Sequence, residues 1–142
     1  IRCREGAGFF HRMGDLGYFD EQGRLWFCGR KSHRVRAPHG VMFTVPCESV
    51  FNTHPAVYRS ALVGVGEPGS QQPVLCVELE PDTRATPELF SALRARGTAN
   101  PLTRNIGVFL VHPSFPVDIR HNAKIFREQL AVWAARQEGR GA

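Results

Sequence analysis

Near the start of the chain, the residues best placed for chemistry are Asp15 and Arg30. They stand close to the two ends of the stretch 14–30, GDLGYFDEQGRLWFCGR, in which two apolar runs, Leu16–Phe19 and Leu25–Cys28, flank an acidic turn with a glycine. This pattern predicts a β-hairpin. Because the open ends of an antiparallel pair lie close together, we expect the carboxylate and the guanidinium to face one site, roughly 5 Å apart. The two groups could bind ligand hydroxyls, or form a surface ion pair worth less than about 1 kcal/mol.

The other candidate is Lys124, which stands within the last amphipathic segment of the chain. Phe126, Leu130 and Trp133 recur there at helical spacing. We therefore expect the final element, Pro116 to Arg136, to hold a helix that packs one face onto a sheet. Lys124 is expected at the mouth of this helix, just after the turn-like Arg120-His121-Asn122. Most lysines at such positions are solvated, so position alone assigns Lys124 no chemical role.

Short apolar runs between turn signals predict the elements that position these residues. Tyr58–Val65, Val74–Leu79 and Ile106–Val111 are rich in β-branched residues and predict three strands of a central sheet. Val35–Ala37 and Val41–Thr44, on either side of a proline and glycine turn, predict a second hairpin.

Two further helices are indicated by their end signals. Pro46–Phe51 begins with a proline and an acidic residue, which suit a first helical turn. Thr86 can cap a helix that ends near Gly97. Together the elements predict an α+β fold, in which a three-stranded central sheet with a hairpin and covering helices is preceded by the hairpin of stretch 14–30.

Composition excludes several classes of function. The 142 residues suffice for one ordinary domain, and a chain that begins with Ile1 rather than Met is expected to be a fragment. No apolar run approaches the roughly 20 residues of a membrane span. The net charge of +5 comes from cations spread along the chain, which favours a solvated surface over nucleic-acid binding. The four cysteines show no metal-ligand spacing, so we expect reduced thiols, no metal site and a cytoplasmic protein.

Two stretches, in the right order, resemble core motifs of the adenylate-forming superfamily, which includes acyl-CoA synthetases, nonribosomal peptide adenylation domains and luciferases. The first is stretch 14–30; the second is Pro116 followed by Asn122-Ala123-Lys124-Ile125-x-Arg127-x-x-Leu130. The resemblance implies that Asp15 holds the ribose hydroxyls of ATP and that Arg30 supports it. It also implies that Lys124 contacts the acyl carboxylate and the α-phosphate. A long, flexible ammonium suits that task, since it offsets the repulsion of two anions and steadies negative charge at phosphorus.

The resemblance further implies two domains. Residues 1–31 are expected to be the tail of a large N-terminal adenylation domain, the rest of which would bind most of the ATP and Mg²⁺. Residues 32–142 are expected to form a small mobile C-terminal domain that delivers and withdraws Lys124. The interdomain hinge falls on Ser32, where the family has Asp or Lys.

The loop at His39 and Gly40 corresponds to the acceptor side of the family's site. Gly40 lies ten residues after Arg30, whereas the family has its glycine at nine. The extra residue argues against the use of CoA, although an ordinary hairpin tip of variable length explains it equally well.

Within the superfamily, the residues of the two motifs are most similar to those of the β-lactone synthetases of bacterial long-chain olefin biosynthesis. This similarity implies activation of a 2-alkyl-3-hydroxy fatty acid as acyl-AMP with release of pyrophosphate. The 3-hydroxyl would then displace AMP, an internal attack favoured by proximity. The alternative is a long-chain fatty acyl-CoA or acyl-AMP ligase. Expected partners are the missing N-terminal domain, the fatty acid and other olefin-pathway enzymes. A non-catalytic binding module is disfavoured because Asp15, Arg30 and Lys124 are all present.

Overall fold

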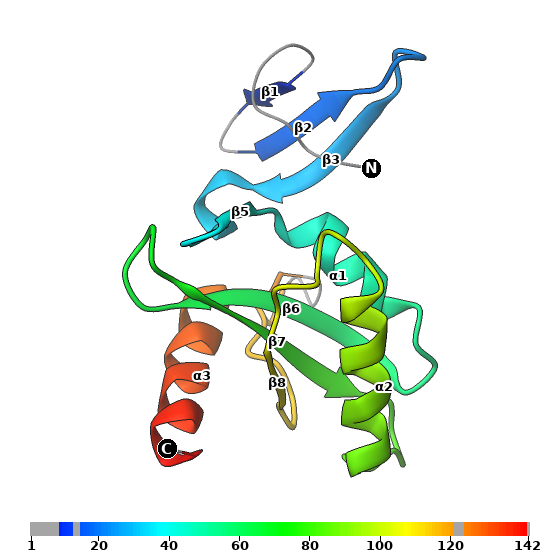
Figure 1. Cartoon of the computed structure of the whole chain (residues 1–142), viewed down its shortest axis with the longest axis vertical. Coiled ribbons are helices and arrows are strands. Elements are labelled where there is room, and N and C mark those ends of the chain that lie inside the picture. Colours follow the sequence, from blue (N-terminus) through cyan, green and yellow to red (C-terminus); the bar gives the residue numbers. More distant parts are fainter. Residues whose placement is uncertain (1–8, 13–14, 121–123, 142) are drawn as a thin grey trace.

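The computed structural model describes residues 9–12, 15–120 and 124–141 of the chain (Figure 1). Its elements, in order, are β1 (Phe9–Arg12), β2 (Asp15–Phe19), β3 (Leu25–Arg30), the 3₁₀ turn η1 (Lys31–His33), β4 (Val35–Ala37), β5 (Gly40–Met42), α1 (Thr44–Asn52), β6 (Val57–Val65), β7 (Gln72–Leu79), α2 (Pro87–Thr98), β8 (Val108–Val111) and α3 (Arg127–Gly141). The α+β fold expected from the sequence is confirmed, with a three-stranded central sheet, a small hairpin and covering helices.

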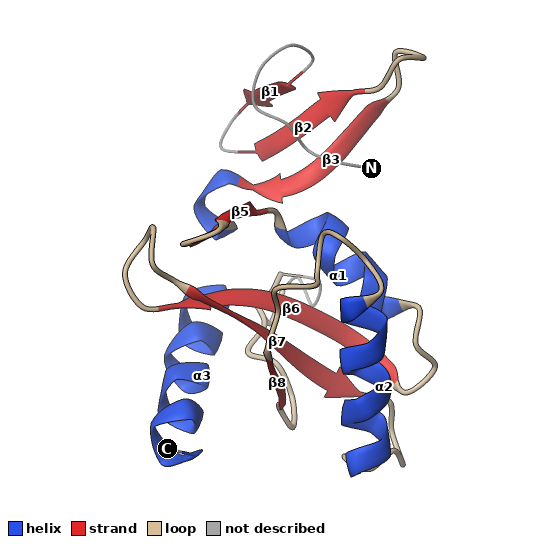
Figure 2. Cartoon of the chain, in the orientation of Figure 1, coloured by secondary structure: helices blue, strands red, loops and turns tan. Residues whose placement is uncertain are grey.

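The central sheet has the order β6-β7-β8, with β6 antiparallel and β8 parallel to β7. Alternating side chains of β6 and β7 divide between two cores. Leu62 and Leu75 pack with Phe51 of α1 and Leu93 of α2 on one face. On the other face, residues such as Ala61 and Cys76 pack with Leu130 and Ala134 of α3. Figures 1 and 2 show the result, with α3 on one side of the sheet and α1 and α2 on the other.

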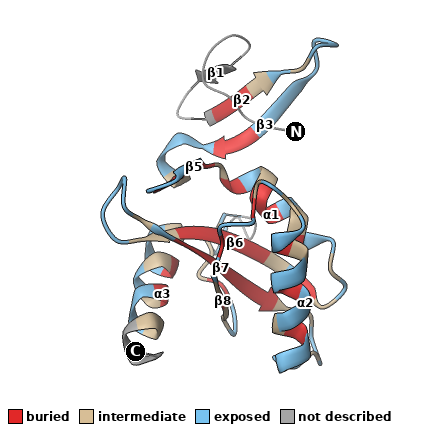
Figure 3. Cartoon of the chain, in the orientation of Figure 1, coloured by how far each residue is buried: buried red, intermediate tan, exposed pale blue. Residues whose placement is uncertain are grey.

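The N-terminal sheet, β1-β2-β3, stands at one end of the molecule, and its tip is largely exposed (Figure 3). Its inner end packs closely against the start of α1 at Gly29. This residue has φ +120°, and a Cβ there would collide with the hydroxyl of Thr44 at the start of α1. Glycine is therefore required twice over at this position, by backbone conformation and by close approach.

The last helix begins later than the sequence pattern predicts. The sequence places Lys124 at the mouth of this helix, whereas α3 starts three residues later, at Arg127. The preceding segment folds back on itself, with a β-bridge between Val117 and Ile125 and a hydrogen bond from the Phe126 N–H to the Pro116 carbonyl at 2.8 Å. These backbone contacts satisfy groups that a helix would otherwise pair.

The first helix also differs from its prediction. Because α1 begins at Thr44, Glu48 is not the first-turn acid that the sequence suggested; it is buried, with 7% of its surface exposed. By contrast, the predicted cap of α2 is confirmed, since the Thr86 hydroxyl accepts a hydrogen bond from the Leu89 N–H at 3.1 Å.

Two of the cysteines are free thiols in the core, as expected. Burial raises the pKa of Cys47 and of Cys76 to about 12, so both thiols are unreactive at neutral pH. Cys28 is disulfide-bonded, so the expectation of reduced thiols is wrong for this residue. Within the described ranges, no helix is long and apolar enough to cross a bilayer.

Candidate functional site

A cavity of about 660 Å³ lies between the base of the N-terminal sheet and the segment that carries Lys124. Its polar lining consists of Arg30, Ser32, His33, Lys124, Arg127 and Glu128, and three apolar side chains complete the wall. Residues from the two motifs, far apart in the sequence, therefore meet in one place. Two of the lining cations, Arg30 and Lys124, and the hinge residue Ser32 were singled out from the sequence.

The hairpin register brings Asp15 and Arg30 together. They are directly opposite partners at the open end of the β2–β3 ladder, as the sequence predicts. The side chain of Asp15 lies outside the described residues, so what the structure places is its backbone position beside Arg30. The ladder has a register shift between Leu16 and Gly17, so a bulge lies next to this pair, after Asp15 in β2 and before Arg30 in β3.

Lys124 is exposed, and its backbone is held by the segment before it. The Lys124 carbonyl accepts a hydrogen bond from the Asp118 N–H at 3.0 Å, and its neighbour Ile125 bridges to Val117. The ammonium can therefore reach a ligand from a backbone that is fixed on one side. The motif residues 121–123, including Asn122 and Ala123, lie outside the described residues.

The proposed hinge is a short 3₁₀ turn that contains no buried residue. Ser32 lies at its centre and is exposed. This turn connects β3 to β4. A few dihedral changes within it can reorient the segments on either side. Whether the chain hinges there stays a prediction.

The acceptor-side residues lie elsewhere. His39 and Gly40 are exposed at the β4–β5 turn, in which Ala37 pairs with Gly40 and Pro38-His39 form the connection. Gly40 has φ +142°, which favours glycine. Neither residue lines the cavity that holds Lys124. Their role toward an acceptor therefore stays a prediction.

His33 links the hinge to the Lys124 side of the cavity. Burial lowers the pKa of His33, the positive charges of Arg127 and Arg30 lower it further, and the Glu128 carboxylate opposes them. The imidazole is accordingly neutral at physiological pH. A neutral ring there leaves the positive charge of this wall to the arginines and Lys124.

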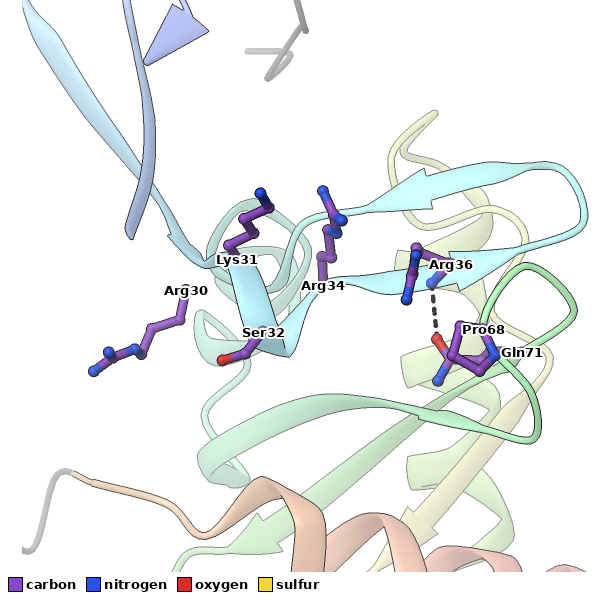
Figure 4. Close-up of a pocket in the computed structure, with 7 residues that line it drawn as sticks. All are labelled: Arg30, Lys31, Ser32, Arg34, Arg36, Pro68 and Gln71. Atoms are coloured by element: carbon purple, nitrogen blue, oxygen red, sulfur yellow. Dashed lines mark hydrogen bonds between the residues drawn. The ribbon is translucent and has the colours of Figure 1, made fainter. Parts of the chain in front are cut away.

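A second, basic groove of about 460 Å³ adjoins the hinge (Figure 4). Arg30, Lys31, Arg34 and Arg36 line it with Ser32, Pro68 and Gln71, and no acidic side chain is among its lining residues. The β6–β7 loop closes one side, because the Gln71 side chain accepts a hydrogen bond from the Arg36 N–H at 2.8 Å. In Figure 4, Arg36 lies beside Gln71 and Arg30 extends in the opposite direction. The groove suits a polyanion.

Comparison with known proteins identifies the family. No protein-family model matches the chain. It is 60% identical over 139 residues to an olefin beta-lactone synthetase of Xanthomonas campestris pv. campestris, which covers 96% of this chain and 25% of the relative. It is also 60% identical over 125 residues to an olefin beta-lactone synthetase of Stenotrophomonas maltophilia, covering 88% of this chain and 23% of the relative. The fold matches the structure of an anthranilate CoA ligase, AuaEII, in complex with anthranoyl-AMP, with a TM-score of 0.77, 21% identity, and 89% of this chain and 25% of that chain covered.

The chain belongs to the adenylate-forming superfamily. It spans about a quarter of the length of the curated relatives that it matches. Its fold is that of the small C-terminal domain of superfamily members, preceded by a three-stranded sheet.

One feature of the structure was not predicted from the sequence, the buried ion pair of Glu48 and Arg127. The Arg127 guanidinium donates to both carboxylate oxygens of Glu48, at 2.7 and 3.1 Å. A charged residue on the inward face of a helix that otherwise buries Cys47 and Phe51 was the available signal. It was interpreted as a helix-terminal charge instead.

Proposed function

We propose that this chain is part of an ATP-dependent, AMP-forming ligase, a β-lactone synthetase, and that Lys124 and Arg30 belong to its active site. The observation that carries the proposal is that Arg30 and Lys124, from the two separate motifs, line one cavity. The first half-reaction joins a fatty acid carboxylate to the α-phosphate of ATP. It gives an acyl adenylate and pyrophosphate.

The side chains of this cavity fit that step. The acyl carboxylate and the α-phosphate are both anionic, so their approach requires positive charge that does not itself react. Lys124 supplies an exposed ammonium on a backbone held by hydrogen bonds, and Arg30 supplies a guanidinium in the lining of the same cavity. Asp15, the strand partner of Arg30, is the group that would accept hydrogen bonds from the ribose hydroxyls.

Magnesium is not assigned to this chain. Among the described residues, no group of three or more His, Cys, Asp or Glu side chains could hold a metal ion. The residues that the structure describes therefore do not fit a Mg²⁺ site of their own. We expect the remainder of the adenylation domain to bind the metal and most of ATP. The chain alone is therefore expected to be inactive.

For the second half-reaction we propose lactone formation. In a 2-alkyl-3-hydroxy fatty acid, the 3-hydroxyl oxygen attacks the acyl carbonyl, the new C–O bond closes a four-membered ring, and AMP leaves as the hydroxyl proton is released. An internal nucleophile needs no second substrate. The support is the 60% identity to two relatives that bear the name olefin beta-lactone synthetase. Other enzymes of olefin biosynthesis are accordingly expected partners.

A second candidate function is that of a long-chain fatty acyl-CoA or acyl-AMP ligase. The basic groove beside the hinge favours the CoA form, because its four cationic side chains could bind the phosphates of CoA. The lengthened stretch between Arg30 and Gly40 argues against it. Both functions share the first half-reaction.

The experiment that separates them uses the full-length parent protein with Mg-ATP and a 2-alkyl-3-hydroxy fatty acid, with and without CoA, and identifies products by mass spectrometry. A β-lactone whose yield is independent of CoA is the expected result. A matched acid that lacks the 3-hydroxyl should release pyrophosphate only to the level of a trapped acyl adenylate. A thioester that forms only with CoA, without lactone, would establish the ligase instead.

A further inference from the structure

The free edge of the central sheet is occupied by two charged side chains rather than by another strand. β6 is the edge strand, and Leu62 lies near its middle. The Leu62 N–H donates to Oε2 of Glu48 at 2.8 Å, and its carbonyl accepts from Nη1 of Arg127 at 3.3 Å. Together, Glu48 and Arg127 satisfy the two backbone groups of Leu62, as a neighbouring strand would.

The two side chains also bind each other in a fixed geometry. Arg127 meets Glu48 through two parallel hydrogen bonds, and the side chains of Arg127 and Glu48 are only 15% and 9% exposed. A bidentate contact that excludes water has little freedom to rotate or slide. The result is one rigid junction between α1, β6 and the first residue of α3.

This junction lies three residues from Lys124. Two backbone hydrogen bonds pair the Lys124 segment with the segment before it, from the Asp118 N–H to the Lys124 carbonyl at 3.0 Å and from the Phe126 N–H to the Pro116 carbonyl at 2.8 Å. Directly after Phe126, the Arg127 guanidinium binds Glu48 and holds the start of α3. Arg127 and Lys124 line the same cavity. The contacts of Arg127 therefore help to hold the backbone that carries Lys124, together with the hydrogen bonds to Pro116 and Asp118.

We propose that Glu48 and Arg127 are positioning residues for Lys124 and act on the acid-activating step only through it. This inference rests on the proposed function, because it assumes that Lys124 serves adenylate formation. We expect that weakening the Glu48–Arg127 contact displaces the Lys124 ammonium, while the fold and nucleotide binding persist. Displacements of about 1 Å at a reacting group can cost about 100-fold in rate.

The test is a double-mutant cycle in the full-length parent, with pyrophosphate release as the readout. Glu48→Gln removes the negative charge without changing side-chain size. Arg127→Lys keeps the positive charge but cannot donate the two parallel hydrogen bonds of the guanidinium. Each is expected to lower kcat about 10- to 100-fold with the KM for ATP changed less than about twofold. In a Lys124→Ala background, adding Glu48→Gln should change the remaining rate by less than about twofold.

A matched control is Thr103→Val, which removes the hydrogen bond from a fully buried hydroxyl to the Gly97 carbonyl, 2.6 Å away, at the far end of α2. It should lower the thermal midpoint as Glu48→Gln does and leave kcat unchanged. Circular dichroism reports which variants are folded. If Glu48→Gln does not fold, Arg127→Lys takes its place in the double-mutant cycle.

Two outcomes would overturn the proposal in different ways. Equal losses from Glu48→Gln with and without Lys124 would show that Glu48 acts independently of the lysine, and a wild-type kcat in both single variants would show that it does not act at all. If Lys124→Ala itself leaves adenylation unchanged, the assigned role of Lys124 fails first, and the positioning role fails with it.

Discussion

The indole N–H of Trp26 donates a hydrogen bond to the carboxylate of Asp20 across the tip of the β2–β3 hairpin, at 2.9 Å. The same carboxylate accepts from the N–H groups of Gln22 and Arg24 and from the Arg24 guanidinium, at 2.7 to 2.9 Å. The hairpin that carries Arg30 is thus closed at its far end by one ionised side chain.

The first prediction concerns acid sensitivity of this tip. The hydrogen bond from Trp26, with those from Arg24 and Gln22, holds the pKa of Asp20 well below its ordinary value of 3.8. Because this folded-state pKa is depressed, the stability that the carboxylate contributes is present above about pH 4 and is lost as the pH falls through the folded-state value. The Trp26 indole N–H resonance should report this loss in NMR. Asp20→Asn should show the perturbed resonance at neutral pH and little further change in acid; a wild-type resonance in Asp20→Asn would contradict the account.

A second prediction concerns His33. Its pKa is lowered from 6.5 by burial first, then by Arg127 and Arg30 against the opposing charge of Glu128. The neutral ring therefore contributes stability that is present above about pH 6.5 and is lost as the pH falls through the folded-state pKa. The thermal midpoint of the wild type should fall more between pH 7.5 and 5.5 than that of His33→Gln. Equal falls would show that His33 does not couple folding to pH.

The elements that can be predicted from this sequence are those specified by residues close to one another in the chain. The β2–β3 hairpin, the pairing of Asp15 with Arg30 and the Thr86 cap were predictable, because turn residues and caps act within a few residues of themselves. The start of α3 was not, since the Val117–Ile125 bridge outweighs the helical spacing of the apolar side chains.

The meeting of the two motifs could not be derived from periodicity either. Arg30 and Lys124 line the same cavity although they stand 94 residues apart, and it was the family resemblance that anticipated this. The Glu48–Arg127 junction escaped prediction for the same reason, because a buried ion pair between distant elements leaves no spacing signal.

A third prediction concerns the other well-shielded ion pair, Arg59 and Glu78, whose side chains are 19% and 11% exposed. Oε1 of Glu78 accepts from Arg59 at 2.9 Å and from the Phe115 N–H at 2.7 Å. Glu78→Ala should lower the free energy of unfolding by about 3 kcal/mol, because it leaves a poorly solvated guanidinium and a buried N–H without this acceptor. Urea denaturation checks the value. Glu78→Gln should cost less, and equal stability of Glu78→Ala and wild type would refute the assignment.

A fourth prediction concerns Gly97 in α2. A Cβ at this position would lie 3.2 Å from Cζ of Phe51, whose side chain is fully buried. Because Phe51 is packed in the core and against Phe109, Gly97→Ala should destabilise the fold by about 1 kcal/mol despite the better helix propensity of alanine. Gly97→Ala combined with Phe51→Leu should recover part of this loss. A more stable Gly97→Ala protein would mean that the core around Phe51 is looser than the structure shows.

The central claim, that Lys124 brings its positive charge to the reacting carboxylate and phosphate, is tested most directly by pyrophosphate release from full-length Lys124→Ala protein. The control is Arg104→Ala, which also removes one positive charge, from an exposed turn after α2. Lys124→Ala is expected to lower kcat about 100-fold or more, and Arg104→Ala is expected to leave it unchanged. A wild-type rate in folded Lys124→Ala protein would contradict it.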